Sequence, residues 1–210
     1  MPDANTLIVY THPLAQERLG RLRDVSTPSC EFRRLLWQLA SFLVDPIFST
    51  LPCRENTVQT PLAPCPSVEP TLPIVMVPIL RAGLGLLDGM LDRVPEAHIG
   101  HLGMFRNEQT LEPVPYYAKL PKETSGGFVV LLDPMLATGH SACHAIEEIK
   151  KCAPAHLTLA TVLASPEGVR QLQEKHPDVR LVTLAIDDSL NEHGYIMPGL
   201  GDAGDRYFGT

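Results

Sequence analysis

The sequence lacks the features that mark several large classes of protein. It contains no CxxC pair, and its five cysteines are odd in number and scattered, at Cys30, Cys53, Cys65, Cys143 and Cys152. No apolar run approaches the roughly 20 residues that a membrane-spanning helix needs. The opening MPDANTLIVYTHPL has neither the basic start nor the apolar core of a signal peptide. We therefore expect a soluble, cytoplasmic protein without a disulfide framework.

The sequence also lacks an excess of positive charge. With 17 Lys and Arg against 24 Asp and Glu, its net charge is −7, whereas a general nucleic-acid binder would carry a basic stripe. This balance still allows a locally basic pocket for an anionic substrate. The 210 residues, 44% of them apolar, can build a sizeable core. We expect one domain spanning residues 1–210.

Residues 1–73 predict helices followed by a connector. Apolar residues recur at helical spacing between Phe32 and Leu43, which is typical of an amphipathic helix packed on a larger body. Within residues 51–73, five prolines lie close together, at Pro61, Pro64, Pro66, Pro70 and Pro73. Because proline fixes φ and removes a backbone donor, we expect this stretch to be an extended connector.

From residue 74 to 189, strands and helices alternate and predict an α/β core. The expected strands are mostly continuous apolar runs, which suit a parallel sheet covered by helices on both faces. They lie near 74–79, 98–104, 128–132, 157–163 and 180–186, and the expected helices near 84–92, 141–152 and 166–175. Ser165 and Pro166 give the last helix a clear start.

The stretch LLDPMLATGHSA, residues 131–142, places a carboxylate at a strand end and a small-residue loop before a helix. The first amides of that helix, with the hydroxyls of Thr138 and Ser141, favour a phosphate. A carboxylate would repel a phosphate, so Asp133 should face a neutral diol, and ribose 5-phosphate offers both groups. The alternative is a capped helix beside a buried strand-end aspartate.

Two look-alike motifs are excluded. No lysine follows Gly139, as a Walker-type loop would need. The tail GLGDAG, residues 199–204, matches a dinucleotide fingerprint literally. Such a fingerprint needs a strand before it and a helix and strand after it, but here Pro198 precedes it and the sequence stops six residues later.

Four blocks resemble the uracil phosphoribosyltransferase family, a branch of the type I phosphoribosyltransferases. They are the stretch above, VPILRAGLGLLDGML (77–91), GMFRNEQTLEPVPYYAKLP (103–121) and LNEHGYIMPGLGDAGDRYFGT (190–210). The resemblance implies transfer from phosphoribosyl pyrophosphate to uracil, giving UMP and diphosphate, with Mg²⁺ carried in mainly on the substrate's diphosphate. It also implies a hood built from the terminal segments and a β-arm, and a homodimer or higher homo-oligomer.

The resemblance assigns residues to both substrates. Arg81 and Arg106 would neutralise the diphosphate by bidentate contacts, and Gly83 would let the backbone approach it. Asp133 would hold the ribose diol with Asp202 nearby, and the 5-phosphate would lie on the following loop. That loop comprises Pro134, Met135, Leu136, Ala137, Thr138, Gly139, His140 and Ser141.

The same resemblance places uracil against the C-terminal block. Ile196, Gly201 and Ala203 would read the base largely through the backbone. Asp202 would polarise the uracil N1–H or bind the metal–diphosphate, or would only form a turn. The expected catalytic residues are therefore Asp202, Asp133 and Arg106, and no metal is expected to be held by the protein alone. Tyr195 would stack on the base or simply pack.

Two features depart from the family pattern, His140 and the segment 44–73, and the role of a third, residues 105–121, is left open. His140 stands where relatives have a second glycine, which would be costly if the loop needed left-handed geometry there. Residues 105–121 predict a β-arm, as a dimer contact or a lid, with Tyr116 and Tyr117 at an interface or in plain packing. The segment 44–73 also differs from the family.

Two rival functions remain at this point. One is a non-catalytic, regulatory protein on the same fold that senses pyrimidine nucleotides or binds RNA, although the net charge of −7 disfavours RNA. The other is a phosphoribosyltransferase for another base, whose strand-end motifs would look the same.

Overall fold

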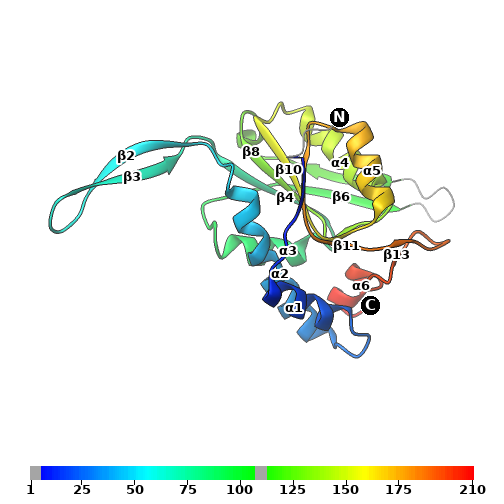
Figure 1. Ribbon diagram of the computed structural model, residues 1–210. Coiled ribbons are helices and arrows are strands. Elements are labelled where there is room, and N and C mark those ends of the chain that lie inside the picture. Colours follow the sequence, from blue (N-terminus) through cyan, green and yellow to red (C-terminus); the bar gives the residue numbers. More distant parts are fainter. Residues whose placement is uncertain (1–5, 107–112) are drawn as a thin grey trace.

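The computed structural model describes residues 6–106 and 113–210, with the side chains of 105, 106 and 113 left out, and shows a central sheet between two layers of helices (Figure 1). The sheet order is β1 (Leu7–Val9), β11 (Arg180–Ile186), β10 (His156–Ala164), β8 (Phe128–Leu132), β4 (Ile74–Leu80), β6 (His101–Arg106) and β7 (Pro113–Lys119). Short strands β5 (His98–Ile99) and β9 (Met135–Leu136) pair with β4 and β10. Neighbouring strands are parallel except β6 and β7, which confirms the predicted α/β fold.

The apolar side chains of the strands belong to two separate cores, because successive side chains of a strand point to opposite faces of the sheet. Ile74 and Met76 of β4 join the core beneath α1 (Pro13–Arg23), α2 (Ser29–Phe48) and α3 (Leu84–Leu91). Val75 and Val77 join the core beneath α4 (His140–Lys150) and α5 (Pro166–Lys175). Runs such as IVMVPIL are therefore apolar throughout because both faces of the sheet are covered.

Most predicted elements are confirmed within two residues of their observed bounds. The hydroxyl of Ser165 accepts a hydrogen bond from the Gly168 amide at 2.9 Å, as expected for the start of α5. The strand expected near 98–104 is interrupted at Gly100 and forms β5 and β6. The Gly100 amide still donates to the Met76 carbonyl at 3.0 Å.

The expected connector at 51–73 is wrong, because this segment forms a β-hairpin that projects from the body (Figure 1). Strand β2 (Cys53–Gln59) pairs antiparallel with β3 (Pro64–Pro70), and the hydroxyl of Thr60 in the turn donates to the Ala63 carbonyl at 2.7 Å. Amides in a paired strand alternate between facing the partner and facing away. The prolines of β3 recur at even positions 64, 66 and 70, so the positions without an N–H can all face away from β2.

The terminal segments meet at one end of the sheet. Helix α6 (Ala203–Phe208) packs against α2, and Arg33 of α2 donates to the Tyr207 carbonyl at 2.8 Å. Strands β12 (Ser189–Leu190) and β13 (Ile196–Met197) pair antiparallel just before α6. A 3₁₀ turn, η1 (Lys122–Thr124), precedes β8. Among the described helices, none has the length and apolar character to cross a bilayer.

The predicted β-arm is described in part. Its flanks are β6 and β7, which pair antiparallel at the edge of the sheet, while residues 107–112 lie outside the described residues. Tyr116 and Tyr117 of β7 are 55% and 45% exposed. A role for them in an interface stays a prediction.

Candidate active site at the carboxyl edge of the sheet

Two predicted site residues follow neighbouring central strands. Arg81 comes directly after β4 and Asp133 directly after β8, and these strands are parallel neighbours. After β4 the chain continues to β6 on one side, whereas β8, β10 and β11 lie on the other. Such a reversal of strand order opens a crevice at the carboxyl ends of the strands, where ligands of open α/β sheets bind.

A small pocket of about 50 Å³ lies between Asp133 and the start of α4. Gly139 precedes α4 with φ of +84°, so the loop turns sharply and the first amides of α4 are left for a ligand. The pocket is lined by Asp133, Met135, Leu136, Ala137, Thr138, Gly139, Ser141 and Ala142. This is the geometry expected of a phosphate loop.

His140 is accommodated without backbone strain. It is the first residue of α4 and is exposed, while the left-handed conformation falls on Gly139. The cost that sequence reasoning attached to a side chain at position 140 therefore does not arise.

Replacing His140 by glycine should keep or raise activity, since the expected phosphate contacts at this position are main-chain. We expect catalytic efficiency at or above the wild-type value, measured by steady-state kinetics beside circular dichroism of the folded variant. A loss of more than about tenfold with intact folding would show that the imidazole itself binds the ligand.

A larger cavity of about 320 Å³ adjoins the phosphate loop and contains the residues predicted to read the base. It shares Asp133, Met135 and Ala137 with the small pocket. Its lining comprises Ala82, Asp133, Pro134, Met135, Ala137, Gly194, Tyr195, Ile196, Gly201, Asp202, Ala203 and Gly204. We refer to it below as the base cavity.

The C-terminal wall of the base cavity is built from a turn and a helix start. Gly201 has φ of +81°, and Asp202 caps α6 by accepting a hydrogen bond from the Asp205 amide at 2.8 Å. The turn-forming role considered for Asp202 is therefore real. A carboxylate in this position still lines the cavity, as Asp133 does.

The two predicted diphosphate arginines are placed differently. The Arg81 guanidinium is 3.5 Å from the Asp205 carboxylate and 5.1 Å from the centroid of the Phe208 ring, with 56% of its side chain exposed. Arg106 ends β6, but its side chain lies outside the described part of the structure. Arg81 thus lies at the rim of the crevice, and the place of the Arg106 side chain stays a prediction.

Sequence reasoning missed a buried ion pair behind the base cavity. Arg23, at the end of α1, forms two bonds of 2.6 Å with Asp187, which directly follows β11. Burial alone would raise the pKa of the Asp187 carboxyl, but hydrogen bonds from Arg23 and from the Gly199 amide lower that pKa below its ordinary value. The position of Asp187 just after a strand was the one available signal.

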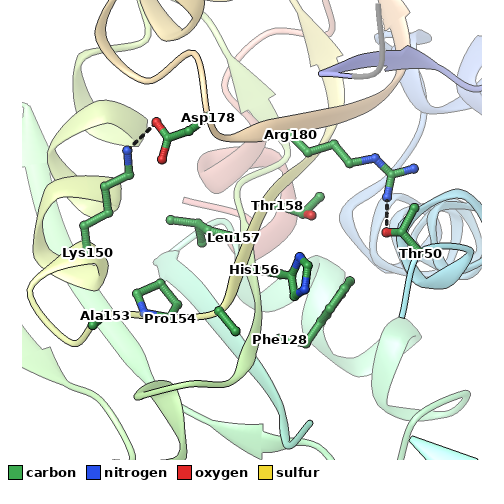
Figure 2. Close-up of a pocket in the computed structure, with 11 residues that line it drawn as sticks. Thr50, Phe128, Lys150, Ala153, Pro154, His156, Leu157, Thr158, Asp178 and Arg180 are labelled. Carbon is green, nitrogen blue, oxygen red and sulfur yellow. Dashed lines mark hydrogen bonds and ion pairs between the residues drawn. The ribbon is translucent and has the colours of Figure 1, made fainter. Parts of the chain in front are cut away.

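A third cavity, of about 470 Å³, opens at the opposite edge of the sheet (Figure 2). Lys150 pairs there with Asp178 at 2.6 Å, and Arg180 donates to the Thr50 hydroxyl at 2.9 Å. Arg180 also donates to the Pro46 and Ile47 carbonyls, which stabilises the C-terminal end of α2. Because the amino ends of the strands lie here, we place the active site at the other edge.

Comparison with known proteins identifies the family of this chain. A family model described as uracil phosphoribosyltransferase matches residues 9–210. The uracil phosphoribosyltransferase of Streptococcus pyogenes serotype M5 is 48% identical over 205 residues, covering 96% of this chain and 97% of its own. That of Bacillus cytotoxicus is 46% identical, covering 97% and 98%.

Solved structures show the same relationship at the level of the fold. The AQ2163 protein from Aquifex aeolicus superposes with a TM-score of 0.92 at 39% identity, covering 96% of this chain and 97% of its own. A hypoxanthine phosphoribosyltransferase from Trypanosoma cruzi reaches 0.51 at 12% identity, covering 80% and 82%, and shares the fold alone.

Proposed function

This chain belongs to the uracil phosphoribosyltransferase family, and we propose that its two joined cavities convert uracil and phosphoribosyl pyrophosphate to UMP and diphosphate. It is accordingly a pentosyltransferase of pyrimidine salvage. The observation that carries the placement is that Asp133 lines both the phosphate loop and the base cavity. The ribose would lie between its 5-phosphate and its base, where the two cavities meet. The Asp133 carboxylate lies beside that place.

The phosphate loop and Asp133 would fix the phosphoribosyl group. Amides at the start of α4 and the hydroxyls of Thr138 and Ser141 suit the 5-phosphate, which also favours the positive end of the helix. The Asp133 carboxylate would accept hydrogen bonds from the ribose hydroxyls. Both contacts hold the anomeric carbon at a fixed place between the two cavities.

The diphosphate would bind at the rim, where Arg81 lies. To reach it, the Arg81 guanidinium would leave the Asp205 carboxylate, an exposed pair that contributes little by itself. Arg106 is proposed to add a second guanidinium from the end of β6. Together they would stabilise the charge that develops on the leaving diphosphate.

The oxygen donors at the site suit Mg²⁺ delivered on the substrate. Mg²⁺ is usually bound by one or two carboxylates together with substrate phosphates. Asp133 and Asp202 both line the base cavity, and one or both would complete the ion's shell beside the diphosphate. When bound, the ion would neutralise part of the diphosphate charge.

Uracil would be read by the wall formed by Ile196, Gly201 and Ala203, with Tyr195 beside it. The base is small and neutral, so main-chain N–H and C=O groups can match its two donors and two acceptors. As the C1–diphosphate bond breaks, N1 of uracil would form the new bond to C1 and release its proton to the departing diphosphate or to solvent. Asp202 is proposed to polarise that N–H, or to hold the metal–diphosphate.

The function is tested by mixing the protein with phosphoribosyl pyrophosphate, Mg²⁺ and uracil, and following UMP and diphosphate by chromatography. We expect both products in equal amounts, and neither without uracil. Release with hypoxanthine or cytosine instead of uracil would indicate a transferase for another base. Nucleotide binding without turnover would indicate a sensor.

Replacing Asp133 by asparagine should weaken the use of phosphoribosyl pyrophosphate by about 2–3 kcal/mol, roughly 30- to 150-fold in kcat/KM, the scale of a charge-assisted hydrogen bond. Asp178→Asn, which removes a carboxylate at the opposite edge of the sheet, serves as the control. Wild-type kinetics in Asp133→Asn would show that Asp133 does not hold the ribose hydroxyls.

We further propose that residues 1–210 act as one domain, with 1–73 and 190–210 completing the 74–189 core, in a cytoplasmic homo-oligomer. The projecting hairpin supports association, since Val58, Leu62 and Val68 are 44%, 96% and 67% exposed along it. The free thiols among the described cysteines suit a reducing compartment. Light scattering measures the oligomeric state directly.

A further inference from the structure

The turn that forms the C-terminal wall of the base cavity needs outside support. It runs from Met197, at the end of β13, to Asp202, just before α6. Gly199 and Gly201 both have left-handed φ angles, of +61° and +81°. Glycine adopts such angles readily but also leaves them readily. The local sequence therefore permits this geometry without enforcing it.

The buried ion pair binds both backbone groups of Gly199. Arg23 donates to the Gly199 carbonyl at 2.8 Å, and the Gly199 amide donates to the Asp187 carboxylate at 2.8 Å. The side chains of Arg23 and Asp187 are only 24% and 6% exposed. A desolvated bidentate pair has a fixed geometry, so it holds Gly199 in one orientation relative to α1 and β11.

Arg206 binds the next residue of the turn. It donates to the Leu200 carbonyl at 2.8 Å and to the carbonyls of Arg23 and Asp24, at the end of α1, at 3.3 and 2.6 Å. Its guanidinium lies 4.6 Å from the centroid of the Phe32 ring. Two arginines thus fix two consecutive residues of the turn to the same helix end.

We propose that Arg23, Asp187 and Arg206 are positioning residues that set the uracil affinity and base specificity of this enzyme, an inference that rests on the proposed function. None of the three is among the described residues that line the base cavity. They act through Gly199 and Leu200, which directly precede Gly201, Asp202 and Ala203 of the wall. The phosphate loop lies between β8 and α4, outside this network. Of the groups proposed to hold phosphoribosyl pyrophosphate, Asp202 directly follows the turn, so binding of this substrate should change far less than binding of uracil.

The test is the uracil KM of Asp187→Asn beside the dissociation constant of phosphoribosyl pyrophosphate, measured by calorimetry without uracil. We expect the uracil KM to rise about tenfold or more, the preference for uracil over cytosine to shrink, and the dissociation constant to stay within about twofold. Arg206→Gln, which leaves the buried pair intact, should give the same pattern if Asp187→Asn folds poorly.

Arg180→Met controls for lost stability alone, because Arg180 supports α2 at the opposite edge of the sheet. It should lower the melting temperature and leave the uracil KM unchanged. An unchanged uracil KM in both test variants, an equal loss for both substrates, or the same uracil KM change in Arg180→Met would overturn the positioning role. The proposed function fails only if the wild-type protein forms no UMP. Failure of the positioning role is therefore distinguishable from failure of the proposed function.

Discussion

Replacing Gly83 by alanine should destabilise the fold and remove most of the activity at once. A Cβ at Gly83 would lie 2.5 Å from the Leu132 carbonyl oxygen, 2.6 Å from the Ile79 carbonyl oxygen and 2.7 Å from the Ile79 nitrogen. All three are backbone atoms of β4 and β8, so no side chain can turn away to make room. Overpacking of this kind costs about 1–3 kcal/mol or more of unfolding free energy, and we expect a loss of about 3 kcal/mol.

The loss of activity follows from the same contacts. Leu132 directly precedes Asp133, and Gly83 lies two residues after Arg81, so separating these backbones moves both strand ends of the site. A misplacement of about 1 Å can cost about 10²-fold in rate, and we expect a loss of that order in kcat/KM.

Denaturant unfolding and steady-state kinetics measure the two effects. Gly20→Ala is the matched control, because a Cβ there meets nothing within 4 Å on the exposed face of α1. Alanine should stabilise that helix by up to about 1 kcal/mol and leave activity unchanged. A wild-type unfolding midpoint in Gly83→Ala would mean that Gly83 does not approach the backbones of β4 and β8 as closely as described.

The core of the fold could be predicted because its signals are local. The continuous apolar run at 128–132 and the mostly apolar run at 180–186 form β8 and β11 with the expected bounds, and Ser165 with Pro166 marked the start of α5. In each case the pattern that suits the element lies within the element itself. The expected carboxyl edge of the sheet pointed to Asp133, whereas the role of Arg81 was assigned by the family resemblance.

The missed features depend on contacts between distant residues. Arg23 and Asp187 are 164 positions apart, and no local pattern pairs a helix end with a strand end at that separation. The hairpin at 53–70 was missed because its prolines were counted without their spacing, and spacing of two is what a ribbon strand tolerates. The left-handed conformation considered for His140 falls one residue earlier, on Gly139, and only the structure shows which of the two residues adopts it.

The base cavity should reject cytosine by about 10²-fold or more in kcat/KM. Cytosine carries an amino group where uracil has O4, and an unprotonated N3 where uracil has an N–H. Each mismatch would leave a group of the site unpaired, at about 1–3 kcal/mol. Competition kinetics with both bases at saturating phosphoribosyl pyrophosphate measures this ratio, and equal rates would mean that the wall does not read the base.

Enlarging the wall by Ala203→Leu should abolish uracil turnover. Ala203 begins α6, is 5% exposed and lines the 320 Å³ base cavity, so three added carbons must enter the space proposed for uracil. The helix start cannot withdraw easily, because Arg206 ties α6 to the end of α1. Activity should therefore fall by more than about 10²-fold, since uracil and the leucine side chain cannot occupy one volume.

The second expected property of Ala203→Leu is that it retains the binding of phosphoribosyl pyrophosphate. Phosphoribosyl pyrophosphate, proposed to bind on Arg81, Arg106, Asp133 and the phosphate loop, should still bind Ala203→Leu with near wild-type affinity by calorimetry. Ala155→Leu makes the same change at an exposed site on the opposite edge and should turn over uracil normally. Because one variant would then separate the two substrates, normal uracil turnover in Ala203→Leu would place the base elsewhere, and loss of both ligands would show that the two cavities are a single site.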